Sequence, residues 1–422
     1  MTGLNGKNTL LLRESNEKTK KGIYCKNDRH NVFESWLCPG KKKKKMNKIK
    51  IFGGLTHYKL KVDKKTGRQV CYPGPVDFYR VMQPLKYLPK DRFEVDVDYD
   101  FYSRFGNAEG VTNYYDIMFM SYIDTVDTYL KFRVLGIKNK MKMVIDLDDN
   151  LWNVDPTHPF YKSDFAPGSE KNFNRSAMFL DADGITTTNS FLRYQMIENI
   201  KIPIKQVEIL PNFIDLTEFD YKNVVPSRSK DKFIIGYLGG SSHFPDMNKS
   251  EFLDALKIIM DKYPQVRFKT CFYMPHLKAL FGYKYEYEIL GSGERYRKEG
   301  WPKMMEEFSC AVAPLVWSKY SRSKSYVKYL EYSAAKVPSI CEKIDPYNEV
   351  LLGHEERGFL ASSTEDWVKH FEFLITHPKE AKDIGEEAYK YIKKDHTIQN
   401  PKNIQLYTDY FEKIYKQKGK EL

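Results

Sequence analysis

The stretch APLVWSKYSRSKSYVKYLEYSAAKVPSI, residues 313–340, decides the fold, because its pattern predicts a strand end, a loop, a helix, a tight turn and a new strand. Within the predicted helix, Lys324, Lys328 and Glu331 follow one another at spacings of four and three. Side chains at these spacings project from one helix face. We therefore expect two cations and one carboxylate to converge near the start of this helix.

Three serines at the start of the predicted helix strengthen the case for an anion site. Ser321, Ser323 and Ser325 are candidate N-cap residues. Backbone N–H groups at the positive end of the helix dipole are then available to an anion. A carboxylate beside a bound diphosphate, here Glu331, can accept hydrogen bonds from the two hydroxyls of a ribose. An ordinary amphipathic helix with solvated lysines would show the same spacing.

Length and composition indicate two α/β domains in one chain. With 422 residues and 41% hydrophobic residues, the sequence can bury two cores of ordinary size. No apolar run reaches 18 residues and no secretory signal is evident, so we expect a cytoplasmic protein, or one of the host cytoplasm if it is viral. The six cysteines lie far apart without a CxxC pair, which favours reduced thiols.

The net charge of +12 is concentrated in the first 45 residues. Residues 1–45 hold 12 basic and 4 acidic side chains, which gives +8, and the remaining 56 basic and 52 acidic side chains give +4. We predict that residues 1–45 are a disordered basic extension. Its five lysines before Met46 are also what a translated ribosome-binding leader would encode, which would make Met46 the natural start. The folded part carries too little charge to indicate a nucleic-acid surface.

Strands and helices are expected to alternate, which is typical of parallel sheets covered by helices. A polar segment near residue 220 separates two such series. We expect an acceptor-side Rossmann-like domain at 46–220, a nucleotide-sugar domain at 221–400 and a helix at 401–422 that returns to the first domain. In such sheets, ligands bind at the carboxyl ends of the strands. Residues 55–73 are polar and are expected to form a loop.

Two glycine-containing motifs directly follow predicted strands. In GYLGGSSH, Gly239, Gly240 and Ser241 can form a backbone nest for phosphate, and His243 can reach the cleft. A tight strand-to-helix turn explains the same residues. In the first domain, Gly53 and Gly54 would let a ligand approach the backbone closely.

A cluster of carboxylates ends the strand near residue 147. Asp146, Asp148 and Asp149 repel one another, and no cation follows nearby in the sequence, so a ligand, a metal or a function must offset the repulsion. Capping of the next helix is the structural alternative. Arg80, on a predicted helix at 74–88, is a candidate partner for a donor phosphate or an anionic acceptor, and a surface salt bridge is its alternative.

Together these segments resemble family 4 of the glycosyltransferases. Residues 314–340 resemble the donor-site helix of that family, Gly239 and Gly240 its glycine loop, and ILPNFID at 209–215 the beginning of its interdomain linker. The sequence DLDDNLW at 146–152 resembles a bacterial and phage subgroup. Ser323 stands where the family usually has the first of two glutamates eight residues apart, and Lys336 stands where it often has glycine.

The resemblance implies the GT-B fold, in which two Rossmann-like domains face each other across a cleft and C-terminal helices pack back towards the N-terminal domain. It also implies a retaining transfer of a sugar from a nucleotide diphosphate, such as a UDP-sugar, to an acceptor hydroxyl, without a covalent nucleophile. The lysines would neutralise the diphosphate, so neither a metal nor a cofactor is expected.

The predicted site residues fall into three groups. The catalytic candidates are Asp148, Asp149 and Lys324. The donor-binding candidates are Gly239, Gly240, Ser241, His243, Ser323, Lys324, Ser325, Lys328 and Glu331. The acceptor-side candidates are Gly53, Gly54, Arg80 and Asp146.

Several acceptors and one non-enzymatic role remain open at this stage. The expected partners are a nucleotide-sugar donor and an acceptor that is a glycan, another cell-envelope component or a protein. A phage-type enzyme that glycosylates DNA with hydroxymethylated bases is an alternative, and a non-catalytic nucleotide-binding protein is another.

Overall fold

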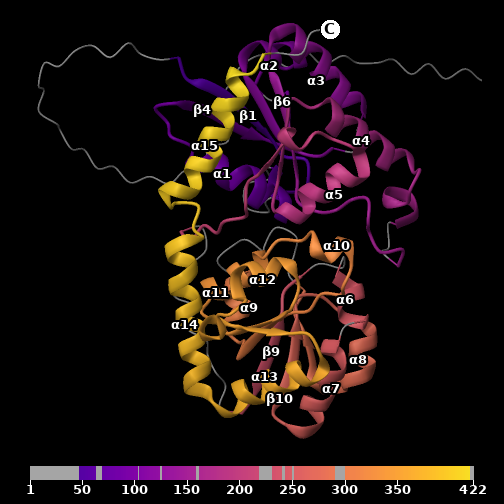
Figure 1. The fold of residues 1–422 in the computed structure, drawn as a ribbon, viewed down its shortest axis with the longest axis vertical. Helices are drawn as coiled ribbons and strands as arrows, with labels where there is room; N and C mark the ends of the chain where they lie inside the picture. Colours follow the sequence, from indigo (N-terminus) through magenta and orange to yellow (C-terminus); the bar gives the residue numbers. More distant parts are fainter. Residues whose placement is uncertain are drawn as a thin grey trace, which may run out of the picture. The chain divides into compact units, whose positions relative to one another are not determined.

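The computed structural model describes residues 47–62, 69–102, 104–123, 126–157, 161–217, 231–239, 243–249, 251–289 and 300–418. The predicted basic extension at 1–45 and the candidate residues Gly240 and Ser241 lie outside the described residues. Two six-stranded parallel sheets and one two-stranded antiparallel sheet form the framework (Figure 1).

The first sheet has the strand order β4-β1-β5-β6-β7-β8, and all its pairs are parallel. Its strands are β1 (Ile49–Gly54), β4 (Phe93–Asp98), β5 (Ile117–Ser121), β6 (Lys142–Leu147), β7 (Gly184–Thr187) and β8 (Val207–Ile209). Both faces are buried: Met143 and Ile145 pack with one apolar cluster, and Val144 between them packs with another. A strand that is apolar on both sides is what a parallel sheet covered by helices requires.

The second sheet repeats this architecture with the order β11-β10-β9-β12-β13-β14. Its strands are β9 (Phe233–Tyr237), β10 (Val266–Thr270), β11 (Tyr285–Tyr287), β12 (Cys310–Ala313), β13 (Ser339–Glu342) and β14 (Phe359–Ala361). Ile234 and Ile235 face opposite apolar clusters, so this sheet is also buried on both faces.

Helices connect the parallel strands. In the first half they are η1 (Asp77–Met82), α1 (Gln83–Tyr87), α2 (Ala108–Tyr114), α3 (Val126–Asn139), η2 (Tyr161–Phe165), α4 (Glu170–Asp181), α5 (Ser190–Ile200) and η3 (Ile204–Gln206). In the second half they are α6 (Phe244–Lys249), α7 (Glu251–Lys262), α8 (Pro275–Phe281), η6 (Gly282–Lys284), α9 (Trp301–Met305), α10 (Lys319–Arg322), α11 (Val327–Ala334), α12 (Asp345–Leu351), η7 (Glu355–Arg357) and α13 (Thr364–Thr376).

Two local predictions for the first half need correction. The expected loop at 55–73 contains β2 (Tyr58–Val62) and β3 (Gln69–Pro73), which pair as an antiparallel hairpin. The expected helix at 74–88 is a π-helix that becomes an α-helix at Gln83. Pro84 lies inside this continuous helical segment, where its missing N–H removes one hydrogen bond to the preceding turn.

The last two helices link the halves, as the GT-B prediction requires. α14 (Pro378–Asp395) packs on α11 in the second half. α15 (Pro401–Lys416) returns to the first sheet, where Tyr407 and Phe411 join the apolar cluster that contains Ile49 and Phe93 (Figure 1).

A close backbone contact fixes the end of α11 against α14. Lys336 follows α11 in the left-handed conformation, with φ of 57°, and its side chain pairs with Glu386 of α14. This conformation explains why glycine is common at such a position. A Cβ placed on Gly385 of α14 would lie 2.2 Å from the carbonyl oxygen of Lys336. Only glycine therefore lets α14 approach the turn this closely.

We expect Gly385→Ala to destabilise the protein by about 2 kcal/mol, since the added methyl group must push the Lys336 backbone away. Alanine in place of glycine inside a helix would otherwise stabilise by about 1 kcal/mol. Gly136→Ala in α3 is the matched control, because its Cβ would lie 3.2 Å from the nearest backbone oxygen and should cost much less. Urea denaturation measures both, and equal losses would contradict this account.

Candidate functional site

The carboxylate cluster at the end of β6 is anchored by a buried ion pair. Arg80 of η1 donates to both oxygens of Asp146, from Nε at 2.9 Å and from Nη2 at 2.7 Å. Its Nη1 donates to the carbonyl oxygen of Leu210 at 2.6 Å and to Asn212 Oδ1 at 2.9 Å. Both partners of the ion pair are almost completely buried. Arg80 and Asp146, two of the acceptor-side candidates, therefore hold strand ends together in a buried ion pair, and the surface salt bridge considered for Arg80 is wrong.

Asp149 is paired with a lysine from the second half of the chain. Lys324 Nζ donates to Asp149 Oδ1 at 3.0 Å, and the Tyr320 hydroxyl donates to Oδ2 at 3.2 Å. Burial alone would raise the pKa of Asp149, but the Lys324 ammonium lowers that pKa below its usual value. The predicted catalytic candidates Asp149 and Lys324 are thus brought together, although 175 residues separate them in the chain.

Asp148 lies between these two ion pairs. Among the described residues, none donates a hydrogen bond to the Asp148 carboxylate. Burial, and then the negative charges of Asp149 and Asp146, raise the pKa of Asp148 to about 7. A carboxyl group with a pKa near neutrality is suited to general acid–base chemistry.

Lys328 and His243 meet on the donor side of the site. Lys328 Nζ lies 3.0 Å from His243 Nε2, and His243 Nδ1 lies 2.8 Å from Asp246 Oδ2. Burial, and then the Lys324 ammonium, lower the pKa of Lys328 to about 8. The predicted donor residues Lys324 and Lys328 are therefore close enough to repel each other.

Glu331 is buried and bound by a tyrosine from the first half. The Tyr79 hydroxyl donates to Glu331 Oε1 at 2.7 Å. Glu331 follows Lys328 by almost one turn of α11, as the spacing predicts. The three residues that define the predicted donor site thus border one region.

The predicted helix start is wrong by about three residues. α10 ends at Arg322, and α11 begins at Val327, so Lys324 precedes the helix. Ser318 caps α10 through its side chain, whereas no side chain caps α11 at Tyr326. The N-terminal turn of α11 therefore has no side-chain hydrogen bond at its cap position.

None of the three expected serines caps α11, and two of them contact the first half of the chain. Ser323 is buried, and its hydroxyl donates to the Lys319 carbonyl oxygen and accepts from Asn150 Nδ2 at 3.1 Å. Ser325 Oγ accepts from Asn212 Nδ2 at 2.8 Å. Ser323 thus stands at the position of the family's first glutamate, and its hydroxyl forms hydrogen bonds within the protein.

Three asparagines hold the segment 319–325 against the first sheet. Asn150 follows β6, Asn189 follows β7 and Asn212 follows β8. Asn189 Nδ2 donates to the carbonyl oxygens of Ser323 at 2.9 Å and Lys324 at 3.1 Å. These residues were not among the predicted site residues. The sequence pattern that could have identified them is an asparagine two or three residues after each of three consecutive strands.

His57, Asp77 and Tyr122 were also missed on the first half. His57 follows β1, its backbone N–H donates to Asp77 Oδ2 at 2.6 Å, and its ring lies 4.8 Å from the Tyr122 ring. Against the larger effect of burial, the interaction with His57 lowers the pKa of the Asp148 carboxyl. The imidazole therefore borders the same region as Asp148.

The described glycines of the predicted site contact the protein itself. A Cβ on Gly53 would lie 2.5 Å from Leu85, and one on Gly54 would lie 2.8 Å from Phe101. Gly239 donates its N–H to Cys271 Sγ, and its Cβ would meet the Tyr237 hydroxyl. Gly53 and Gly54 thus make room for packing, which differs from their predicted role in ligand approach.

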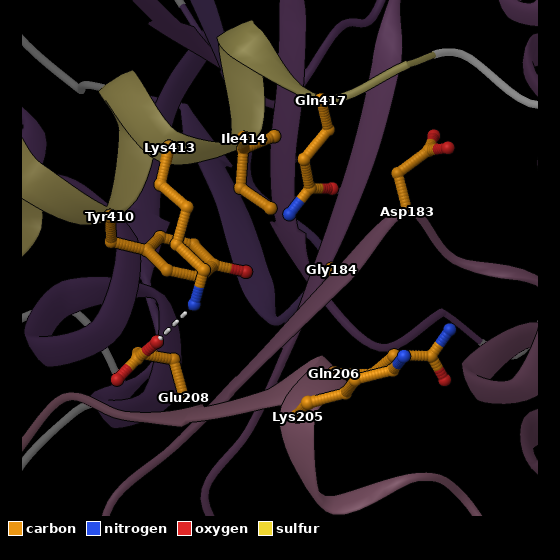
Figure 2. A pocket seen from close by; sticks show the side chains of 9 residues that line it. All are labelled: Asp183, Gly184, Lys205, Gln206, Glu208, Tyr410, Lys413, Ile414 and Gln417. Carbon is orange, nitrogen blue, oxygen red and sulfur yellow. Dashed lines mark hydrogen bonds and ion pairs between the residues drawn. The ribbon is translucent and has the colours of Figure 1, made fainter.

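A separate cavity of about 220 Å³ lies at the amino ends of β7 and β8, at the opposite edge of the first sheet from Asp148. Figure 2 shows the side chains of Tyr410, Lys413 and Ile414 from α15 beside Gly184. Lys413 pairs there with Glu208 at 2.8 Å. This cavity contains none of the predicted site residues.

The described ranges contain neither a metal-binding cluster nor a membrane-spanning helix. Within them, no three side chains of His, Cys, Asp or Glu come together as a metal site. No helix in the same ranges has the length and hydropathy needed to cross a bilayer.

Comparison with known proteins agrees with this geometry. A family model described as glycosyl transferase-like matches residues 270–401. The fold is similar to Anabaena HepE in complex with UDP-glucose, with a TM-score of 0.58 and 12% identity over 86% of this chain and 100% of HepE. It is also similar to a glycosyltransferase from Rickettsia africae, with a TM-score of 0.57 and 14% identity over 88% of this chain and 100% of that one. No curated protein matches the chain in sequence.

The predicted GT-B fold of two parallel-sheet α/β halves is confirmed by the two sheets and by these solved structures. The match of residues 270–401 to a glycosyl transferase-like family supports the predicted glycosyltransferase class of enzyme.

We expect Asp148→Asn to stabilise the protein at pH 8 by about 2 kcal/mol, because the folded state disfavours the Asp148 carboxylate. The folded-state pKa is raised, so the unfavourable contribution of Asp148 is absent below pH 4 and grows as the pH rises to about 7. The gain in stability of Asp148→Asn over the wild type should therefore be absent below pH 4 and grow as the pH rises to about 7. Thermal unfolding from pH 4 to 8 measures it, and an advantage independent of pH would contradict this explanation.

Proposed function

We propose that the protein is a retaining glycosyltransferase that moves a sugar from a UDP-sugar to an acceptor hydroxyl. The observation that carries the proposal is the convergence of Lys324, Lys328 and Glu331 at the uncapped start of α11. Two cations and a helix N-terminus suit a diphosphate, and a buried carboxylate suits a ribose. The complexes of HepE with UDP and UDP-glucose support uracil as the base of the donor nucleotide.

In the proposed reaction, the bond between the anomeric carbon and the diphosphate oxygen breaks, and the electron pair stays with the diphosphate. Lys324, Lys328 and the first N–H groups of α11 stabilise the charge that develops there. Because these groups stabilise the charge of the leaving group, the proposed reaction needs no metal for that purpose. Before the donor binds, Lys324 is held by Asp149, so its ammonium is already placed at the site.

Glu331 would bind the ribose hydroxyls in this proposal. Its carboxylate already accepts a hydrogen bond from Tyr79 at one oxygen. A carboxylate offers about four lone pairs in two oxygens, so it can accept hydroxyl donors in addition to Tyr79. Tyr79 would then orient the carboxylate from the opposite half of the molecule.

Asp148 is the group that we propose to receive the acceptor hydroxyl. Asp146 is bound by Arg80 and Asp149 by Lys324, which leaves Asp148 as the carboxylate without an ionic partner among the described residues. Its pKa of about 7 lets it exist as a base and take up a proton near neutral pH. The new bond forms between the acceptor oxygen and the anomeric carbon, on the face that the diphosphate leaves.

By its resemblance to family 4, the proposed enzyme would belong to the bacterial and phage subgroup with the DLDDNLW motif and would retain the configuration of the anomeric carbon. Its acceptor would be a glycan, a cell-envelope component or a protein. Residues 46–220 would form the acceptor side, and residues 221–400 the donor side. The four cysteines among the described residues are free thiols, which supports a cytoplasmic enzyme.

Lys324→Met should strongly reduce the thermal shift that a sugar nucleotide produces, because the variant lacks one of the two ammonium groups proposed to bind the diphosphate. We expect UDP to bind at least about tenfold more weakly, a loss near 1.4 kcal/mol. Lys319→Met is the matched control, because Lys319 lies five residues earlier in an exposed ion pair with Glu198. A panel of sugar nucleotides in a thermal-shift assay tests the proposal. Unchanged shifts in the Lys324 variant would refute this donor site.

Asp148→Asn should reduce kcat by at least about 100-fold, which is the usual contribution of a general base. Its affinity for UDP should stay within about threefold of wild type, because Asp148 belongs to the acceptor side. In the wild type, kcat/KM should fall as the pH drops through about 7, when the carboxylate becomes protonated. A variant with full activity would exclude Asp148 as the base.

Tight UDP binding without turnover of any sugar nucleotide would favour the non-catalytic alternative. Transfer of sugar to DNA with hydroxymethylated bases would instead favour the DNA-modifying alternative. That reaction should depend steeply on salt, because phosphate contacts release counterions.

A further inference from the structure

We propose that Asp246 and His243 form a positioning unit that holds Lys328 in place for the donor diphosphate. The inference rests on the proposed function for its ligand. The sequence suggested that His243 itself faces the donor. In the structure, both ring nitrogens are already engaged, with Asp246 on one side and Lys328 on the other.

The contacts define the tautomer of the imidazole. Asp246 Oδ2 can only accept a hydrogen bond, so His243 Nδ1 must donate across their 2.8 Å contact. An uncharged ring then has a lone pair at Nε2, which accepts from Lys328 Nζ at 3.0 Å. Burial, and then Lys328, lower the pKa of His243 to about 4, so the ring remains uncharged at neutral pH.

Asp246 is itself fixed in place. Its Oδ1 accepts the backbone N–H of Val316 at 3.0 Å, and the side chain is buried. Val316 follows β12 in the loop that leads to α10, so the unit is tied to the segment that carries Lys324. The chain from Val316 through Asp246 and His243 to Lys328 has a hydrogen bond at every step.

The surroundings of Lys328 make its charge depend on the ligand. The groups that act on its ammonium besides His243 are Lys324, Glu331, Asp246, Cys271 and the ring of Tyr237, which lies 5.7 Å away. Burial, and then Lys324, lower its pKa to about 8, so at pH 8.5 much of Lys328 is neutral. A diphosphate beside it favours the ammonium and raises that pKa. Donor binding above pH 8 should therefore take up a proton from solvent.

Two substitutions at His243 separate positioning from simple space filling. In His243→Asn the amide can still donate to Asp246, but it is too short to accept from Lys328. In His243→Gln the longer side chain can place its amide oxygen near the position of Nε2. His370→Asn is the control, because His370 is also buried in the second half, where its Nε2 contacts the Leu360 carbonyl oxygen.

Titration calorimetry with UDP at pH 8.5, in two buffers of different ionisation enthalpy, tests the proposal. The wild type should take up roughly 0.7 proton per UDP. His243→Asn should bind UDP about tenfold more weakly, and His243→Gln and His370→Asn should stay within about threefold of wild type. Equal affinities for the Asn and Gln variants, or binding without proton uptake in the wild type, would overturn the inference.

A measurement without UDP separates this inference from the proposed function. Acylation of Lys328 by acetic anhydride, followed by mass spectrometry from pH 6 to 11, should show a midpoint near 8 in the ligand-free wild type. Acetic anhydride should acylate Lys328 faster at high pH in the His243→Asn variant than in the His243→Gln variant. In His243→Asn, no side chain at position 243 accepts a hydrogen bond from the Lys328 amine. If UDP does not bind but these results are obtained, the proposed donor is wrong and the positioning unit stands. Indistinguishable Asn and Gln variants would refute the unit.

Discussion

The buried ion pair between Arg80 and Asp146 is the interaction on which the remaining site depends. Through one guanidinium it joins η1, the end of β6 and the backbone after β8, and Thr186 of β7 adds a hydrogen bond to the same carboxylate. Removing one partner of a buried pair leaves an uncompensated charge, which typically costs about 3–5 kcal/mol. The ends of three strands are thereby fixed in one arrangement, and Asp148 and Asn212 extend from it.

The same strand edge positions the donor segment of the second half. Amide groups of Asn150, Asn189 and Asn212 donate to residues 319–325, and these contacts are buried or partly buried. Neutral amides suit this task, because they form directional hydrogen bonds without adding charge beside a lysine and three carboxylates. Lys324 can therefore reach Asp149 only because the asparagines of the first sheet hold its backbone there.

Charge balance in the site is achieved by residues far apart in sequence. Asp146 is neutralised by Arg80 and Asp149 by Lys324, whereas burial and then the negative charges of Asp149 and Asp146 raise the pKa of Asp148. On the donor side, burial and then repulsion by the Lys324 ammonium lower the pKa of Lys328. In the proposed reaction, a proton from the acceptor would neutralise Asp148, and the donor diphosphate would stabilise the ammonium of Lys328. The reaction would therefore relieve both unfavourable charges.

The sequence by itself determined the two α/β halves and the donor helix, since strand and helix periodicity are local properties and the Lys328–Glu331 spacing is fixed by the helix. It located the carboxylate cluster but not its partners. The contacts of the folded chain were needed to show that Arg80 is internal, that His243 lies against Lys328 and that Gly53 makes room for Leu85. The physical reason is that hydrogen bonds, burial and charge pairing depend on what the folded chain brings within a few ångströms, and one-dimensional spacing does not contain that information.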